Sequence, residues 1–337
     1  QDVKISNSSA FPISSDGSQM PIILNDVILD KNAFDGIEIR GGQIVERQQI
    51  TWPNNGLVYI VSGVVEVQAN TTLTIEPETI LKFWQPPNGN APGLRVRGLL
   101  KAENVIFTSV YDSGDDVGGP TYVEARDPAP GDWAGIVFQE SSGKSYLRNS
   151  RILYAGQGQG AIAMAASSPE LVDVTISDSA WYPLSADADS FPTFTNITLR
   201  DNDPGDALEI RGDSAITGRQ ERTWGVLKNG DSQIVRVIRG NVIVKPEAML
   251  TIEPGVVIKF EPKGKLVVQG TLHAIGGGKD DERIVFTSLR DDEYGGVTDK
   301  NTGPQDDRSW DGILFDKTDD TSVLQNAIVH YGSVAFN

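Results

Sequence analysis

The sequence repeats itself over nearly its whole length. Residues 3–13 return as residues 174–184, at an offset of 171, and Leu-Thr-Ile-Glu-Pro at 73–77 returns at 250–254, at an offset of 177. We therefore divide the chain into two tandem copies, residues 1–171 and 172–337, of a unit of about 171–177 residues. Repetition on this scale predicts an extended repeat architecture.

The offset between the copies changes only where Gly- and Pro-rich segments change length. Ten residues separate Phe83 from Leu94, whereas five separate Phe260 from Leu266. Constant apolar segments joined by variable segments are typical of strands and surface loops. Because no linker-like tract interrupts residues 160–180, we predict one continuous body over residues 1–337.

A shorter period of 22 to 24 residues runs inside each copy. Leu153, Ile176 and Leu199 fall 23 residues apart, and short alternating stretches are bounded by Asn, Asp, Gly and Pro. Since helical periodicity is nowhere sustained, the pattern predicts an all-β fold, a parallel β-helix (solenoid) of about 14 rungs. The charged residues that alternate with apolar ones along each strand should point outward. The residues expected to point inward include Ile75, Ile252, Phe83, Phe260, Phe107 and Phe286.

Longer motifs connect this pattern to a known family. Residues 74–77 lead to 81–83, then to 107–109, 131–138 and 147–154, and the second copy carries the same series as 251–260, 286–288, 309–315 and 324–331. These motifs resemble the right-handed parallel β-helix repeats of secreted and surface-anchored bacterial and archaeal proteins, with the pectate-lyase-like superfamily fold. The resemblance implies a right-handed β-helix and an extracellular or cell-surface location. Function stays open, because such proteins include stalks, adhesins, carbohydrate binders and lyase-like enzymes.

Composition excludes several classes of partner and site. The chain carries 46 acidic and 29 basic residues, a formal net charge of −17, which argues against nucleic-acid binding. No apolar run approaches the roughly 18 residues needed to span a bilayer. With no cysteine, the chain has neither disulfides nor thiolate metal sites.

Acidic loops are the candidates for cation binding. Hard oxygen ligands that close a long surface loop suit Ca²⁺, although neither loop has a regular calcium-loop spacing, and a solvated acidic surface is the alternative. No other cofactor is expected. The candidate ligands are Asp112, Asp115, Asp116 and Asp132 in the first copy and Asp291, Asp292, Asp299 and Asp306 in the second.

No catalytic set is predicted. Arg40 and Arg211 could each be a lyase-type base, but both copies carry this arginine beside a glutamate, which favours an outward ion-pair ladder. His273 and His330 are the only histidines and have no counterpart in the other copy, so they are assigned no role. The tryptophans 52, 133, 224 and 310 occur in matched pairs, which favours a structural role over stacking on sugars.

The ends of the chain carry the assembly prediction. Residues 333–337 stop in the phase of 161–165, and residue 1 enters in the phase of 172, so a β-helix cut in this way exposes a strand edge at each end. Either the chain is part of a longer repetitive protein, or copies stack head-to-tail through these ends. The apolar residues expected at such a junction are Val3, Ile5 and Phe11 on one face and Val334 and Phe336 on the other.

These observations predict a structural, noncatalytic β-helix of the extracellular space or cell surface. It would act as a filament or fibre subunit, a stalk or an adhesin, with itself as partner along the helix axis. The alternative is a polysaccharide-binding or lyase-like β-helix that uses a lateral groove. The two differ in what they require, since an enzyme needs one unduplicated cleft with convergent carboxylates and a base.

Overall fold

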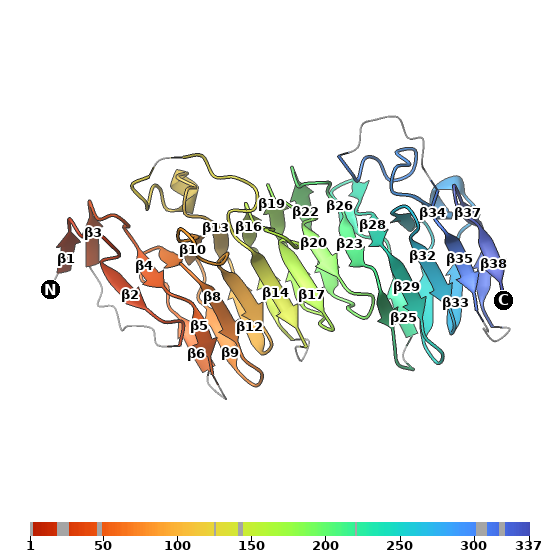
Figure 1. Ribbon diagram of the computed structural model, residues 1–337, viewed down its shortest axis with the longest axis horizontal. Coiled ribbons are helices and arrows are strands. Elements are labelled where there is room, and N and C mark those ends of the chain that lie inside the picture. Colours follow the sequence, from red (N-terminus) through yellow and green to blue (C-terminus); the bar gives the residue numbers. More distant parts are fainter. Residues whose placement is uncertain are drawn as a thin grey trace. The chain divides into compact units, whose positions relative to one another are not determined.

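The computed structural model describes residues 3–18, 27–45, 49–124, 126–140, 144–219, 221–300, 309–316 and 321–337. The chain is an all-β parallel β-solenoid of about 13 turns (Figure 1), close to the 14 expected. No α-helix occurs among the described residues, and none of them forms a helix that could cross a membrane. Two short 3-10 turns interrupt the strands, η1 (Asp115–Val117) and η2 (Asp280–Glu282).

The chain divides into two compact units, which are described one at a time. The first comprises Gln1–Ala163, Ser167–Trp181 and Pro192–Asn202, and the second comprises Met164–Ala166, Tyr182–Phe191 and Asp203–Asn337. The units do not coincide with the two sequence copies, because residues 192–202 of the second copy belong to the first unit. One continuous body over residues 1–337 therefore stays a prediction.

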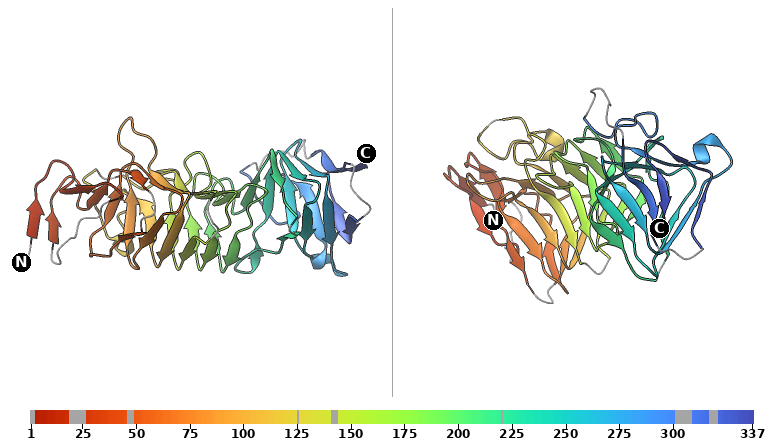
Figure 2. Two further views of the ribbon diagram at one scale, coloured as in Figure 1. Left: turned by 90° about the horizontal axis from the view of Figure 1, so that it is seen from below. Right: turned by 45° about the vertical axis from the view of Figure 1, so that its right-hand side comes forward.

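The first unit stacks its strands in three parallel rows (Figure 2), with a separate pair, β1 (Val3–Ser6) and β3 (Val27–Asp30). The first row contains β2 (Ile13–Ser15), β4 (Ile37–Ile39), β7 (Tyr59–Val61), β10 (Ile80–Phe83), β13 (Ile106–Ser109), β16 (Arg151–Leu153), β19 (Thr175–Ser177) and β22 (Thr198–Arg200). The second contains β5 (Gly42–Ile44), β8 (Val64–Val67), β11 (Gly93–Val96) and β14 (Gly135–Gln139). The third contains β6 (Gln49–Trp52), β9 (Thr72–Ile75), β12 (Leu99–Glu103), β15 (Tyr146–Arg148), β18 (Glu170–Val172) and β21 (Thr193–Thr195). β17 (Ile162–Ala165) is divided between the units.

The strands of the second unit also lie in three parallel rows, and this unit has one small antiparallel hairpin, β26 (Lys228–Asn229) with β27 (Ser232–Gln233). Its first row contains β20 (Leu184–Ala186), β23 (Leu208–Arg211), β28 (Arg236–Arg239), β31 (Val257–Phe260), β34 (Ile284–Ser288) and β37 (Ala327–Val329). The second contains β24 (Ser214–Ile216), β29 (Asn241–Val244), β32 (Lys265–Val268), β35 (Gly312–Phe315) and β38 (Val334–Phe336). The third contains β25 (Glu221–Trp224), β30 (Met249–Ile252), β33 (Thr271–Ile275) and β36 (Val323–Gln325).

The pairing registers preserve the sequence duplication. Leu81 pairs with Phe107 between β10 and β13, and the equivalent residues Ile258 and Phe286 pair between β31 and β34. Because a register slip of one residue would turn every core side chain toward solvent, the alternating pattern determines this register. The duplication in sequence is thus also a duplication in strand pairing.

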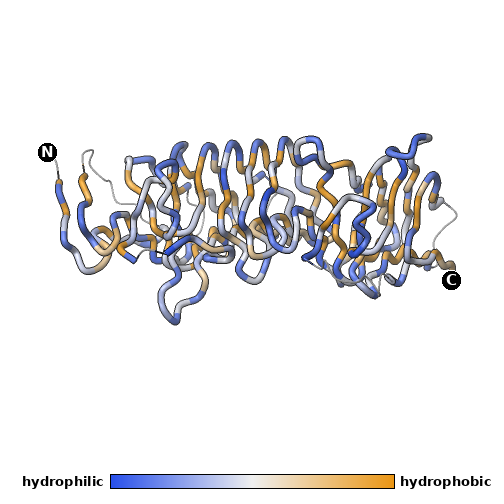
Figure 3. Tube along the Cα trace, turned by 90° about the horizontal axis from the view of Figure 1, so that it is seen from above, coloured by the Kyte–Doolittle hydropathy of each residue, from blue (hydrophilic) through white to orange (hydrophobic). Residues whose placement is uncertain are grey.

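The core consists of the inward alternates of each strand. In β8 and β9 every second residue is buried, and Figure 3 shows hydrophobic and hydrophilic residues alternating along the coils. The six residues predicted to point inward are all at most 1% exposed, which confirms that prediction. Full burial of each such side chain contributes about 1.5 to 3 kcal/mol.

Asn and Asp occupy the corners that lead into the first row of strands. In the first unit Asn104, Asn149, Asp173 and Asn196 all have a left-handed backbone, with φ between 47° and 54°. These residue types tolerate that conformation better than most others. The backbone N–H groups of Asn104, Asn149 and Asp173 also donate to carbonyls of the next coil, as from Asn149 to the Val172 carbonyl at 2.9 Å. The Asn and Asp residues that flank the strands in the sequence therefore form the turns of the solenoid.

Two matched tryptophans close the core behind the long loops. The Trp133 ring stacks on Phe83 at 3.9 Å between centroids, and Trp310 stacks on Phe260 at 4.0 Å. The indole N–H of Trp133 donates to the Leu153 carbonyl at 2.8 Å, as that of Trp310 does to the His330 carbonyl. All four paired tryptophans are buried, so their role is structural, as the pairing predicts.

Candidate functional site

Three loops of the first copy that differ from their counterparts in the second come together in the structure. The connection after Phe83 is five residues longer than its counterpart, and seven residues separate Tyr154 from Ile162 where two separate Tyr331 from Val334. The third loop, residues 110–132, is named here the first excursion. The Gln157 side-chain amide donates to Gln85 Oε1 at 3.2 Å, which links two of these loops directly.

A buried lysine holds the first excursion on the solenoid. Lys82 lies on β10 and points away from the core, as the alternation predicts, but the excursion covers it and the side chain is fully buried. Its ammonium donates to the carbonyl of Asp112 at 2.6 Å and to that of Gly119. Burial lowers the pKa of Lys82 to about 8, so the amine is still protonated at neutral pH.

The second copy contains the same anchor. Lys259 on β31 is also fully buried, and its ammonium donates to the carbonyl of Gly296. Burial lowers the pKa of Lys259 to about 8 as well. In both copies a lysine ammonium is thus bound by loop carbonyls beneath the acidic loop in which calcium was predicted.

The first excursion is also fastened along its edge to an earlier coil. Asp35 N–H donates to the Thr121 carbonyl at 2.9 Å, and Val123 N–H donates to the Ala33 carbonyl at 3.2 Å. These bonds flank an isolated antiparallel bridge between Phe34 and Tyr122. The excursion (the yellow loop of Figure 1) is therefore held at both its root and its edge.

An aromatic cluster forms where the excursion meets this coil. Phe34 stacks between Phe11 at 3.9 Å and Tyr122 at 4.3 Å, and the ring of Trp84 meets Phe34 edge-on at 4.8 Å. Tyr111 meets Tyr122 edge-on at 5.8 Å. The cluster is unduplicated: the positions of Phe34, Trp84 and Tyr111 are taken by glycine, glutamate and arginine at 205, 261 and 290.

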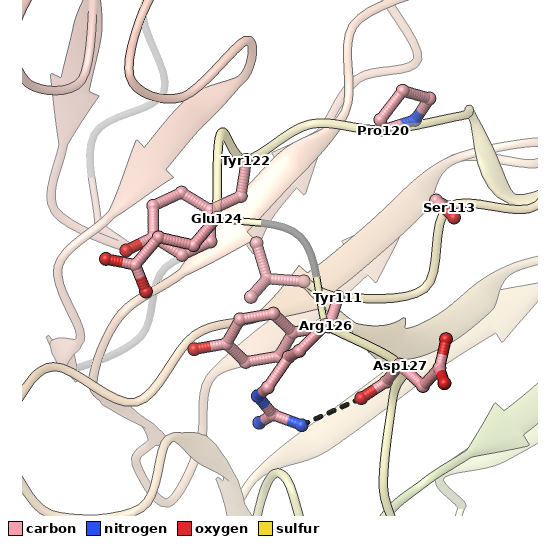
Figure 4. Close-up of a pocket in the computed structure, with 8 residues that line it drawn as sticks. Tyr111, Ser113, Pro120, Tyr122, Glu124, Arg126 and Asp127 are labelled. Carbon is pink, nitrogen blue, oxygen red and sulfur yellow. Dashed lines mark hydrogen bonds between the residues drawn. The ribbon is translucent and has the colours of Figure 1, made fainter.

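Two neighbouring cavities lie against this cluster and share Tyr111 and Arg126. We call them together the aromatic groove. The larger has a volume of about 500 Å³ and is lined by Val110, Tyr111, Ser113, Pro120, Tyr122, Glu124, Arg126 and Asp127 (Figure 4). The smaller has a volume of about 320 Å³ and is lined by Gln85, Pro86, Pro87, Asn88, Tyr111, Arg126, Gly131, Asp132 and Gln157.

The Arg126 side chain lines both cavities and is held in a defined position. Its guanidinium carbon lies 3.4 Å from the centroid of the Tyr111 ring, and it donates to Asp132 Oδ1 at 2.6 Å and to the Asp127 carbonyl at 3.0 Å. Ser109 Oγ donates to the other oxygen of Asp132 at 2.5 Å. Since Asp132 already neutralises Arg126, Glu124 and Asp127 leave the groove with an acidic balance.

Tyr122 presents a protonated hydroxyl at the groove. Burial, together with the neighbouring Glu124 carboxylate, raises the pKa of Tyr122 to about 12. Aromatic faces beside amide, hydroxyl and carboxylate groups can bind a ligand that has both apolar faces and hydroxyl edges.

Three of the four predicted calcium ligands of the first copy are engaged by protein donors. Asp112 accepts from Thr108 Oγ1 at 2.6 Å, and Asp116 pairs with Arg151 at 2.6 Å, which lowers the pKa of that carboxyl. Asp132 accepts from Ser109 and Arg126, while Asp115 begins η1 and is exposed. The structure therefore spreads these four carboxylates over separate contacts, and calcium binding there stays a prediction.

In the second copy one predicted ligand, Asp291, lies with Glu293 and His330, neither of which was predicted to be a ligand. Asp291, Glu293 and His330 place one ligand atom each within 4.8 Å of one another, the one such group of three among the described residues. Asp292 is exposed and Asp299 is half-buried, and neither belongs to this group. Asp306 lies outside the described residues.

The predicted assembly residues lie in different environments. Val3 on β1 and Val334 and Phe336 on β38 are exposed, with Phe336 at 77%. Ile5 is half-buried, and Phe11 packs into the aromatic cluster. Stacking through these residues stays a prediction.

Comparison with family models, with curated proteins and with solved structures finds no match to this chain. The signal that could have revealed the groove lies in the sequence itself. Loops and aromatic residues that break the repeat, such as residues 84–92, Tyr111 and 155–161, are the ones that line it or contact its walls. Sequence reasoning used these differences only to place loops.

Proposed function

We propose that this protein is a noncatalytic β-solenoid of the extracellular space or cell surface that binds a neutral polysaccharide through the aromatic groove. The observation that carries the proposal is the convergence of three first-copy loops on one unduplicated groove. Sugar rings offer apolar C–H faces and hydroxyl edges, which match the Tyr111 and Tyr122 rings and the amides of Gln85 and Gln157. The resemblance of the repeats to right-handed β-helices of secreted and surface-anchored proteins supports the location.

The charge of the groove favours a neutral saccharide over a polyuronate. Arg126 is already paired with Asp132, whereas Glu124 and Asp127 have their carboxylates at the wall. A chain of uronic acids would bring like charges to this acidic surface, which costs free energy. A lyase-like protein that acts on uronates is therefore the weaker alternative.

The test is binding to a panel of neutral and acidic polysaccharides, measured by calorimetry. We expect binding to a neutral member and a loss of at least tenfold for Tyr111→Ala, because that ring forms part of both cavities. Arg290→Ala changes the equivalent position of the second copy and should leave affinity unchanged. Failure of every polysaccharide to bind, or equal affinity for Tyr111→Ala, would overturn the proposal. Release of an unsaturated sugar product would instead favour the lyase alternative.

A second proposal is that copies stack head-to-tail as a filament or fibre subunit. It is supported by the exposed apolar side chains of β38, although a further stretch of chain would cover these as well as a second copy would. Sedimentation of the wild type and of Phe336→Asp tests it. We expect the wild type to form polymers and Phe336→Asp, which adds a charge, to form shorter ones. A wild type that stays monomeric at high concentration would contradict stacking.

A further inference from the structure

We propose that Asp291, Glu293 and His330 form a binding site for a divalent first-row transition ion of the zinc type. The three side chains come from two separate segments, the start of the second excursion (residues 289–309) and the residue after β37. His330 Nδ1 lies 3.0 Å from Asp291 Oδ2. Ligand atoms around a tetrahedral zinc ion with bonds of about 2.0 to 2.2 Å lie roughly 3.3 to 3.6 Å apart. The group therefore needs only a small adjustment to hold such an ion.

Asp291 is oriented in advance. Its side chain is 2% exposed, Thr287 Oγ1 donates to Oδ2 at 2.5 Å, and the Glu293 N–H donates to Oδ1 at 3.2 Å. A buried carboxylate held in this way loses little conformational entropy on binding an ion. Glu293 is exposed and His330 is about one-third exposed, so an ion can enter from solvent and keep a water ligand.

The first copy provides an internal comparison for the carboxylate. Asp112 makes the same contacts as Asp291, accepting from Thr108 Oγ1 at 2.6 Å and from the Gly114 N–H at 3.4 Å. The duplicated aspartate therefore has a structural role, because its hydrogen bonds fix the start of each excursion. Glycine at 114 and leucine at 153 stand where the second copy has Glu293 and His330. The two additional ligands are thus specific to the second copy and unnecessary for folding the loop.

The donor set determines the class of ion. One imidazole nitrogen with two carboxylate oxygens suits zinc and its neighbours, whereas calcium prefers six to eight oxygen ligands. The rings of Tyr294 and Tyr331 flank His330, with centroids at 6.0 Å and 3.9 Å, and restrict the orientation of the imidazole. A bound ion would join the excursion to the coil of β37, and this role is independent of the aromatic groove.

The experiment uses the full chain without an affinity tag, freed of metal with a chelator. Titration with zinc chloride should show one site per chain and a rise in melting temperature that equimolar calcium chloride does not produce, because an ion that binds only the folded state stabilises it. His330→Leu and Glu293→Gly, which introduce the first-copy residues, should each weaken zinc binding at least tenfold. Circular dichroism should show that both variants keep the fold.

His273→Leu serves as the matched control, since His273 lies outside the group and should leave zinc affinity unchanged. Absence of zinc binding by the wild type would overturn the proposal. So would unchanged zinc affinity in His330→Leu, because the ion would then sit elsewhere. A response to calcium alone would also overturn it and would favour the oxygen-ligand site predicted from the sequence.

Discussion

The two excursions of this protein begin alike and end differently. Both start with a threonine that bonds an aspartate, Thr108 to Asp112 and Thr287 to Asp291, and both lie over a buried lysine. Besides these shared anchors, the first excursion carries Tyr111, Tyr122 and Arg126, whereas the second excursion contacts His330. The comparison separates two kinds of residue: duplicated residues hold the loops, and unduplicated residues distinguish the candidate site of one copy from the equivalent place in the other.

The largest expected effect tests whether the duplicated core is equivalent in both copies. Phe83→Ala and Phe260→Ala should each cost about 3 to 5 kcal/mol, because each removes a fully buried ring stacked on a tryptophan. Thermal unfolding followed by circular dichroism measures the loss. If one substitution were nearly neutral, the two cores would not be equivalent.

Alkaline pH tests the two buried lysines together. Because burial lowers both pKa values from 10.5 to about 8, the unfolded chain binds more protons than the folded chain between these values. Stability should therefore rise with pH across this window, on the order of 1 to 3 kcal/mol per lysine. Above pH 10 it should fall, since burial raises the pKa of Tyr59 to about 12 and unfolded tyrosines ionise first.

Equilibrium denaturation between pH 7 and 11 measures this profile. In the double variant Lys82→Met/Lys259→Met, stability should no longer rise with pH but should still fall above pH 10. A wild type whose stability declines steadily from pH 8 would show that the lysines titrate normally in the folded state.

The single lysine substitutions sharpen the difference between the excursions. Lys82→Met leaves the carbonyls of Asp112 and Gly119 without this donor and should cost about 1 to 3 kcal/mol. It should also weaken polysaccharide binding, because the first excursion forms the wall of the groove. Lys259→Met should destabilise the second excursion and spare binding. Amide hydrogen exchange localises each effect, and equal loss of binding in both variants would contradict the separation.

The smallest expected effect concerns an ion pair that only the first copy has. Arg151 pairs with Asp116, and the equivalent position in the second copy is Ile328. Arg151→Ile should cost less than about 1 kcal/mol, because the pair is partly exposed and screened by water. The melting temperature, compared at low and high salt, checks this estimate. A loss above 2 kcal/mol would mean that the pair holds the excursion.

The fold was predictable because its signal is local. Alternation within strands of three to five residues places Ile75 and Phe107 inside, and the 22- to 24-residue period stacks them on the next coil. The matched tryptophans were predictable for the same reason, since a residue that recurs at the same place in the repeat meets the same neighbours. The division into two compact units does not follow the two copies and was not predictable from the offsets.

The sequence by itself determined the parallel solenoid, the inward residues and the matched tryptophans, because each depends on spacing along one or two coils. Only the tertiary structure decided what the loops do. It buried Lys82 and Lys259 beneath the excursions, although alternation correctly turned them away from the core. It brought Gln85 to Gln157 across 72 residues and Asp291 to His330 across 39. The physical reason is that an irregular loop has no period, so its path depends on side chains and carbonyls contributed by distant coils.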